Sequence, residues 1–137
     1  MTAMNDRSGD TTLMNTDGCS VPENNIALGL LHRGREYRLS PGDAPFVIGR
    51  DADVCDLCIA SEYGSRKHCV IEYRDSKFVL HDYSTNGTYV QLGRADNVRV
   101  HNETIPLIGH GSFKPGQNFR PDDPELIHFV IRDLSPA

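Results

Sequence analysis

From residue 26 onward, the chain is made of short apolar runs separated by turn residues, and this spacing constrains its fold more than any other feature. The predicted strands are residues 27–31, 37–39, 46–48, 57–59, 68–73, 78–82, 88–92, 97–100, 103–107 and 126–132. Two of the connections, 33–35 and 74–77, are short enough to form hairpins. No stretch repeats its apolar residues with the 3.6-residue period of an amphipathic helix. The pattern therefore predicts an all-β chain, folded as a two-sheet antiparallel β-sandwich.

The length of the chain and its change in composition near residue 26 predict one folded domain that follows a tail. A single core commonly occupies about 100–150 residues, and the chain has 137. Residues 1–25 are rich in Thr, Asn, Asp, Ser and Gly, which predicts a disordered N-terminal tail. Residues 26–137 form the predicted sandwich domain, in which the polar segment 115–125 is expected to be a loop.

The charge distribution narrows the class of partner. The formal net charge is −5, and no basic block is longer than Arg66-Lys67. Nucleic acid is therefore not expected as a partner. A small cationic group formed by Arg50, Arg66 and Lys67 on an acidic body suits one anionic group better than a polyanion. No run of about 18 apolar residues occurs, so no membrane-spanning helix and no membrane partner are expected.

Four cysteines are present, at positions 19, 55, 58 and 69. The amino terminus is polar and lacks the apolar core of a secretory signal, so we expect a cytoplasmic protein with reduced thiols. Cys55 and Cys58 form a C-x-x-C pair, which raises the possibility of a zinc site with His68 and Cys69. Adjacent side chains on a strand point to opposite faces, so one metal ion cannot easily take both His68 and Cys69. Free thiols are the favoured interpretation, and neither a metal nor a cofactor is expected.

Three polar motifs carry the chemistry, and each follows a predicted strand. They are Gly49-Arg50, Ser65-Arg66-Lys67-His68 and Ser84-Thr85-Asn86-Gly87-Thr88. Taken singly, Gly49-Arg50 and Asn86-Gly87 are ordinary turn sequences. Together the motifs supply a fixed cation, a hydroxyl and an amide from separate loops, which is the set of donors that an anion-binding site needs.

The residue types assign a role to each motif. A phosphorylated threonine has a charge of about −1.5 to −2 and three acceptor oxygens. Arg50 can give it two parallel hydrogen bonds, and Ser65 adds a hydroxyl without bulk. The main-chain N–H of Arg66 can donate as well, while the side chains of Arg66 and Lys67 add positive potential. The Asn86 amide can both donate to and accept from a peptide backbone, with Thr85 in a supporting role.

The order of these motifs resembles that of the forkhead-associated (FHA) family, whose FHA/SMAD-like β-sandwich recognises phosphothreonine in partner peptides. The resemblance covers roughly residues 26 to 133 and implies that Arg50 and Ser65 hold phosphate while Asn86 holds the peptide. It also implies a supporting role for a further set of residues, namely Gly49, His68, Gly87 and Thr88. The preference for residues flanking the phosphothreonine is expected to depend on the loop around Tyr63.

The segment 109–116 departs from the family pattern of a glycine-aspartate turn followed by an Ile-x-Leu-Gly strand. We interpret it as a variant edge strand, because Pro115 cannot donate a hydrogen bond inside a sheet. This edge and the connection at 94–96 look like those of bacterial FHA modules linked to nucleotide cyclases.

The resemblance predicts a phosphothreonine-dependent interaction module in bacterial Ser/Thr-kinase signalling, with a phosphothreonine protein or peptide as its partner. The alternative is a phosphate-independent scaffold or dimerisation domain on the same fold. A hydrolase with Ser65, His68 and Asp82 is disfavoured, because no nucleophile elbow or oxyanion loop surrounds the serine, and no enzyme activity is expected. A phosphorylated Thr11 or Thr12 in the tail could also occupy the site of the same molecule.

Overall fold

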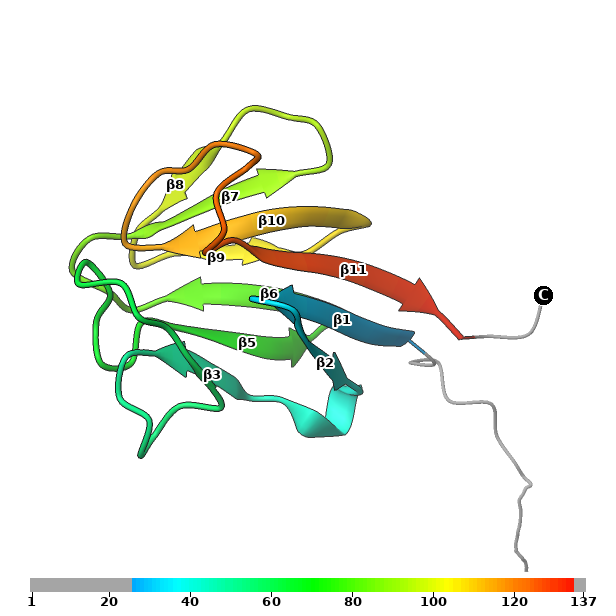
Figure 1. The fold of residues 1–137 in the computed structure, drawn as a ribbon. Helices are drawn as coiled ribbons and strands as arrows, with labels where there is room; N and C mark the ends of the chain where they lie inside the picture. The colour runs from blue at the N-terminus through cyan, green and yellow to red at the C-terminus, as the bar shows by residue number, and fades with distance from the viewer. Residues whose placement is uncertain (1–25, 135–137) are drawn as a thin grey trace, which may run out of the picture.

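A computed structural model describes residues 26–134 as two β-sheets packed face to face (Figure 1). The strands are β1 (Ile26–His32), β2 (Arg35–Leu39), β3 (Phe46–Gly49), β4 (Leu57–Cys58), β5 (Cys69–Arg74), β6 (Lys77–Asp82), β7 (Thr88–Leu92), β8 (Val98–Val100), β9 (Thr104–Pro106), β10 (His110–Pro115) and β11 (Ile127–Asp133), with one 3-10 turn, η1 (Pro41–Asp43). One sheet has the order β2-β1-β11-β10-β7-β8 and the other β4-β3-β5-β6-β9. All neighbours run antiparallel except β3 and β4. The prediction of an all-β, largely antiparallel sandwich is confirmed.

The predicted tail at residues 1–25, including Thr11, Thr12 and Cys19, lies outside the described residues. The disorder predicted for the tail and the boundary predicted at residue 26 stay predictions.

The core lies between the sheets and is filled by alternate residues of their strands. Leu28, Ile48, Phe78, Leu80 and Phe113 are fully buried. Because side chains alternate between the two faces of a strand, each apolar run sends every second residue inward. Complete burial of one such side chain contributes about 1.5–3 kcal/mol. This inner face holds the two sheets together and leaves the loops free to vary.

Two hairpins form where the sequence predicts them. Arg33 and Gly34 connect β1 to β2 with φ angles of 51° and 80°, and Asp75 and Ser76 connect β5 to β6 with φ angles of 51° and 66°. Positive φ at both central residues is the geometry that matches the right-handed twist of paired strands. These turns set the register of both strand pairs.

The prediction of a variant edge strand at 109–116 is wrong, because β10 lies inside the six-stranded sheet between β7 and β11. The N–H groups along a strand point alternately to its two neighbours. The N–H of Gly116 donates to the carbonyl oxygen of Gly87 in the residue before β7, at 2.8 Å. Pro115 therefore faces the β11 side, where the pairing has already ended at Phe113 and Ile127. Its missing N–H costs no hydrogen bond of the sheet.

The sandwich places several loops at one end. The connections β3–β4, β4–β5 and β6–β7 all lie at the left end of the molecule in Figure 1, and the long β10–β11 connection lies above them. The three polar motifs of the sequence are on the first three of these connections. The fold thus brings together groups that are far apart along the chain.

Candidate functional site

Main-chain hydrogen bonds join the three polar loops into one surface. Arg50 donates its N–H to the carbonyl oxygen of Ser65 at 3.0 Å, and Asp51 donates to that of Arg66 at 3.2 Å. The N–H of Thr85 donates to the Ser65 hydroxyl at 3.3 Å. Residues from the β3–β4, β4–β5 and β6–β7 loops are therefore in direct contact, with Ser65 at their centre.

Arg50 presents its guanidinium at this surface. The side chain is exposed, and its Nη1 lies 3.5 Å from the carbonyl oxygen of Glu62. A methyl group at Gly64 would lie 3.2 Å from Arg50 Cγ, so this glycine leaves room for the arginine stem. Within residues 26–134, no carboxylate forms an ion pair with Arg50. Its charge is available to an external anion.

The Arg66 side chain makes an interaction that the sequence did not predict. Its Nε and Nη2 donate to Oδ2 of Asp51 at 3.1 and 2.7 Å. These hydrogen bonds, together with one from the N–H of Asp53, lower the pKa of the Asp51 carboxyl. The Arg66 N–H makes no hydrogen bond within the described part of the chain and remains able to donate. Lys67 is exposed beside it.

His68 connects two of the loops from behind. It is fully buried, its Nδ1 accepts the N–H of Ser65 at 2.9 Å, and its Nε2 lies 2.8 Å from the carbonyl oxygen of Gly87. These partners require a neutral ring that carries its proton on Nε2. Neither ring nitrogen is left to act as a base for Ser65, although Asp82 lies 3.7 Å from Nε2. The geometry suits the predicted bracing role and gives no support to a hydrolase.

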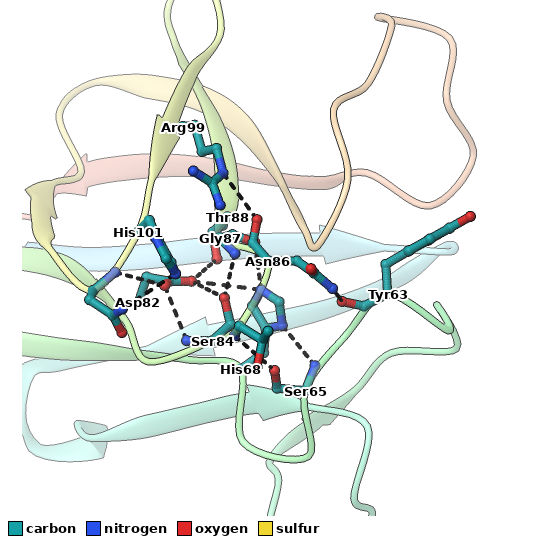
Figure 2. Close-up of polar contacts among 12 residues, drawn as sticks. Tyr63, Ser65, His68, Asp82, Ser84, Asn86, Gly87, Thr88, Arg99 and His101 are labelled. Atoms are coloured by element: carbon teal, nitrogen blue, oxygen red, sulfur yellow. Dashed lines mark hydrogen bonds and ion pairs between the residues drawn. The ribbon is translucent and has the colours of Figure 1, made fainter.

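Asp82 organises the third loop, as the network of dashed lines in Figure 2 shows. Its buried carboxylate accepts hydrogen bonds from the Ser84 hydroxyl at 2.7 Å, the Thr88 hydroxyl at 2.8 Å and the Asn102 N–H at 2.9 Å. Burial raises the pKa of Asp82, but these hydrogen bonds and that from the Ser84 N–H outweigh it and lower the pKa below its ordinary value. The carboxylate therefore stays charged and keeps the loop closed around it.

Asn86 lies at the outer edge of this loop. Its Nδ2 donates to the carbonyl oxygen of Tyr63 at 2.9 Å, and the main-chain carbonyl oxygen of Asn86 accepts from Nε of Arg99 at 3.1 Å (Figure 2). One Nδ2 hydrogen and the Oδ1 oxygen remain for a ligand. Thr85 is exposed next to it, and Tyr63 is half-exposed across the gap between the two loops.

Two glycines of the site are required by the close approach of other groups. A Cβ on Gly49 would overlap the carbonyl oxygen of Arg66 and lie 2.9 Å from the Cys55 sulfur. Gly87 has a φ of +88°, and a Cβ there would lie 2.9 Å from Nε of Arg99. Only glycine lets the neighbouring chain come this near at both positions.

Sequence reasoning assigned no supporting role to three residues of this arrangement, namely Asp82, Ser84 and Arg99. Ser84 both donates to Asp82 and accepts the N–H of Gly87 at 2.7 Å. The spacing of Asp82 and Ser84 before an Asn-Gly turn is a local signal that could have identified both, since such side chains bond to the backbone of nearby turns. Arg99 had no local signal, because it is placed only by the pairing of β8 with β7.

Two cysteines of the site, Cys55 and Cys58, use their thiols as hydrogen-bond donors. Cys55 donates to the carbonyl oxygen of Arg66 at 3.1 Å, and Cys58 to that of Arg50 at 3.3 Å. Cys69 is fully buried, and burial raises the pKa of its thiol. Among residues 26–134, no three His, Cys, Asp or Glu side chains are grouped so as to hold a metal ion. The same residues include no helix long and apolar enough to cross a membrane.

The buried histidines make stability depend on pH. Burial lowers the pKa of His68 below 6.5, although the Gly87 carbonyl and Asp82 act in the opposite direction, and burial lowers the pKa of His32 as well. The folded protein then binds fewer protons than the unfolded chain below about pH 6.5. The stability that depends on these two neutral histidines is fully present above that pH. It is lost as the pH falls toward their pKa values in the folded protein.

We therefore expect urea unfolding to give a smaller free energy of unfolding at pH 5.5 than at pH 7.5. The loss is about 1.4 kcal/mol for each unit by which the pKa is lowered, once the pH is below both values. NMR titration of the imidazole signals of His68 and His32 identifies the source. Stability that rises between pH 7.5 and pH 5.5, or a His68 ring that protonates above pH 6.5, would contradict this expectation.

Comparison with known proteins relates this arrangement to one family. Residues 46–109 match the family model described as FHA domain. No curated protein sequence matches the chain. The FHA-1 domain of Rv1747 from Mycobacterium tuberculosis aligns with a TM-score of 0.60 at 23% identity, covering 78% of this chain and 97% of that chain.

Two further solved domains are similar in fold. The FHA domain of a hypothetical protein from Arabidopsis thaliana aligns with a TM-score of 0.60 at 20% identity, covering 88% of this chain and 98% of that chain. The MEK1 FHA domain, solved in complex with a phosphothreonine peptide of HOP1, aligns with a TM-score of 0.55 at 18% identity, covering 79% of this chain and 97% of that chain. At these identities the likeness is one of fold.

Proposed function

We propose that this chain, whose residues 46–109 match the FHA domain model, is a phosphothreonine-dependent peptide-binding module that mediates protein–protein interaction. The observation that supports this most strongly is the position of Arg50. Its guanidinium lies exposed on a surface shared by three loops, without a carboxylate partner within residues 26–134. An arginine held in this way is suited to a bidentate contact with phosphate.

The phosphate contacts follow from the donors at the centre of the surface. Arg50 supplies two parallel N–H groups, the Ser65 hydroxyl supplies a third donor, and the free N–H of Arg66 a fourth. The Ser65 oxygen already accepts the N–H of Thr85, so the hydroxyl hydrogen is free to point outward. Lys67 and the Arg66 side chain add positive potential, although Asp51 offsets the latter. The donors come from different loops, as the three oxygens of a phosphate require.

The peptide contacts involve Asn86 and its neighbours. Asn86 is held by Tyr63 through one hydrogen of its amide, so the remaining Nδ2 hydrogen and Oδ1 can pair with one peptide carbonyl and one peptide N–H. Thr85 lies exposed beside it and can take part through its hydroxyl. The complex of the MEK1 FHA domain with a phosphothreonine peptide supports this use of the fold.

The wider setting of the module is also part of the proposal. We infer that residues 26–137 act as one domain, with residues 1–25 as its tail, and that a bacterial Ser/Thr kinase in the cytoplasm creates the phosphothreonine on the partner. An interaction module fits the site better than an enzyme, because His68 has no free nitrogen for catalysis. Whether Thr11 or Thr12 serves as an internal ligand stays a hypothesis.

An oriented phosphothreonine peptide library tests the proposal, followed by calorimetry on the best sequence and on its unphosphorylated form. We expect binding only to the phosphorylated peptide. If the library gives no selective peptide, and a natural partner still binds after phosphatase treatment, then the phosphate-independent scaffold is the correct function. A phosphoserine version of the same peptide measures how strongly the site selects threonine.

A further inference from the structure

Arg99 occupies an unusual position for a surface arginine. It lies in β8 at the edge of the six-stranded sheet, opposite Tyr89 of β7, and its side chain reaches back to the loop that carries Asn86 (Figure 2). The residue is exposed. It is therefore on the same surface as the peptide-binding asparagine but belongs to none of the three polar motifs.

The side chain of Arg99 is held in one orientation. Its Nε donates to the carbonyl oxygen of Asn86 at 3.1 Å, and its stem lies over Gly87, where a Cβ would be 2.9 Å from Nε and 3.1 Å from Cγ. Because a guanidinium that is already positioned loses little conformational entropy when a ligand binds, its contacts are more favourable than those of a mobile side chain.

The terminal nitrogens of Arg99 are not satisfied within residues 26–134. Its hydrogen bond to Asn86 uses Nε alone, and no Asp or Glu among residues 26–134 forms an ion pair with it. Arg66, by comparison, is paired with Asp51. In a chain with a formal net charge of −5, a positioned arginine without a carboxylate partner is an unmatched positive group.

From this geometry we propose that Arg99 recognises a second anionic group of the bound peptide, close in sequence to the phosphothreonine. The inference rests on the proposed function. The side chain of Asn86 is assigned to the peptide, and the main-chain carbonyl of Asn86 holds Arg99. A peptide bonded to Asn86 therefore passes within reach of the Arg99 guanidinium. The group is a carboxylate of Asp or Glu, or a second phosphate, and both offer the paired oxygens that a guanidinium fork binds.

The test compares peptides and variants in a cycle. A phosphothreonine library whose other positions are neutral yields a parent peptide, and single Glu replacements are then made at each flanking position. Wild-type protein, Arg99→Gln and Arg38→Gln are measured against every peptide. Arg38 is the matched control, because it is an exposed arginine in β2 at the opposite edge of the same sheet and its loss changes the net charge equally. A doubly phosphorylated peptide distinguishes phosphate from carboxylate.

We expect Glu at one or two adjacent positions to tighten binding to the wild type and to Arg38→Gln by about 3- to 30-fold. In Arg99→Gln this gain is lost, whatever the affinity for the parent peptide becomes. Arg99→Lys keeps the charge without the fork and is expected to retain part of the gain. The gain also shrinks as salt is raised, since exposed charges are screened.

Each outcome decides between the two proposals. If the parent peptide binds and neither Glu nor a second phosphate at a flanking position improves affinity, or if Arg99→Gln keeps the full gain, then the inference about Arg99 is wrong and the proposed function stands. If no phosphothreonine peptide binds the wild type, the proposed function fails and the inference fails with it. Two-dimensional amide spectra of each variant show that the fold is retained.

Discussion

Replacement of Arg50 by alanine is expected to weaken binding of a selected phosphothreonine peptide by about 30- to 1000-fold, while the protein remains folded. A hydrogen bond to a charged group contributes about 1.5–3 kcal/mol, and the guanidinium can make two of them to one phosphate. The fold does not depend on this side chain, because it is exposed and its guanidinium makes only a long contact of 3.5 Å with the carbonyl oxygen of Glu62 among residues 26–134. Isothermal titration calorimetry measures the loss.

Two further variants show what Arg50 contributes. Arg50→Lys keeps the charge but not the planar fork, so we expect an affinity between those of the wild type and Arg50→Ala. Arg38→Ala removes an equivalent exposed charge far from the loops and is expected to leave affinity unchanged. An Arg50→Ala protein that binds within threefold of the wild type would show that phosphate is held elsewhere, and the site assignment would have to be abandoned.

Replacement of Asp82 by asparagine is expected to lower the free energy of unfolding by about 3–5 kcal/mol, the largest stability effect that we predict for a polar residue. The carboxylate accepts hydrogen bonds from Ser84, Thr88 and Asn102 without any exposure to solvent. An amide turns two hydrogens toward groups that are themselves donors, which leaves buried polar groups unpaired. Urea unfolding measures the change in free energy, with the slope m as a check on two-state behaviour.

The matched control is Asp75→Asn. Asp75 is exposed in the β5–β6 turn with a φ of 51°, a conformation that asparagine also tolerates, so we expect a change within about 0.5 kcal/mol. Because Asp82 holds the loop that His68 joins to Ser65, amide signals of Ser65 and Gly87 should also shift in Asp82→Asn. A loss of less than 1 kcal/mol would mean that the loop does not depend on this carboxylate.

Most of the strands could be predicted because their signals are local. The turn at Arg33-Gly34 and the apolar run at the start of β6 each involve a few neighbouring residues, and the structure agrees with them. β10 was predicted as an edge strand because of Pro115. The effect of this proline depends on which neighbouring strand its nitrogen faces and where the pairing with that strand ends. Those facts are properties of the pairing, and a local pattern does not contain them.

The residues of the site divide in the same way, into those with a local sequence signal and those placed by tertiary contacts. Residue type and order predict Arg50, Ser65 and Asn86 as the binding residues, and the structure brings their loops together. The ion pair between Arg66 and Asp51, and the contact of Arg99 with Asn86, were not foreseen. Each depends on the path of a separate strand or loop through space.

The sequence by itself determined the class of fold and the set of candidate anion donors, because strand periodicity, turn conformation and side-chain chemistry are properties of short segments. Only the tertiary structure decided which of those donors are free. The pairing of strands sets whether Arg66 reaches Asp51, whether His68 joins Ser65 to Gly87, and whether Arg99 reaches the loop that carries Asn86. Such contacts join residues far apart in the chain, and their strength depends on distances that arise only when the two sheets pack.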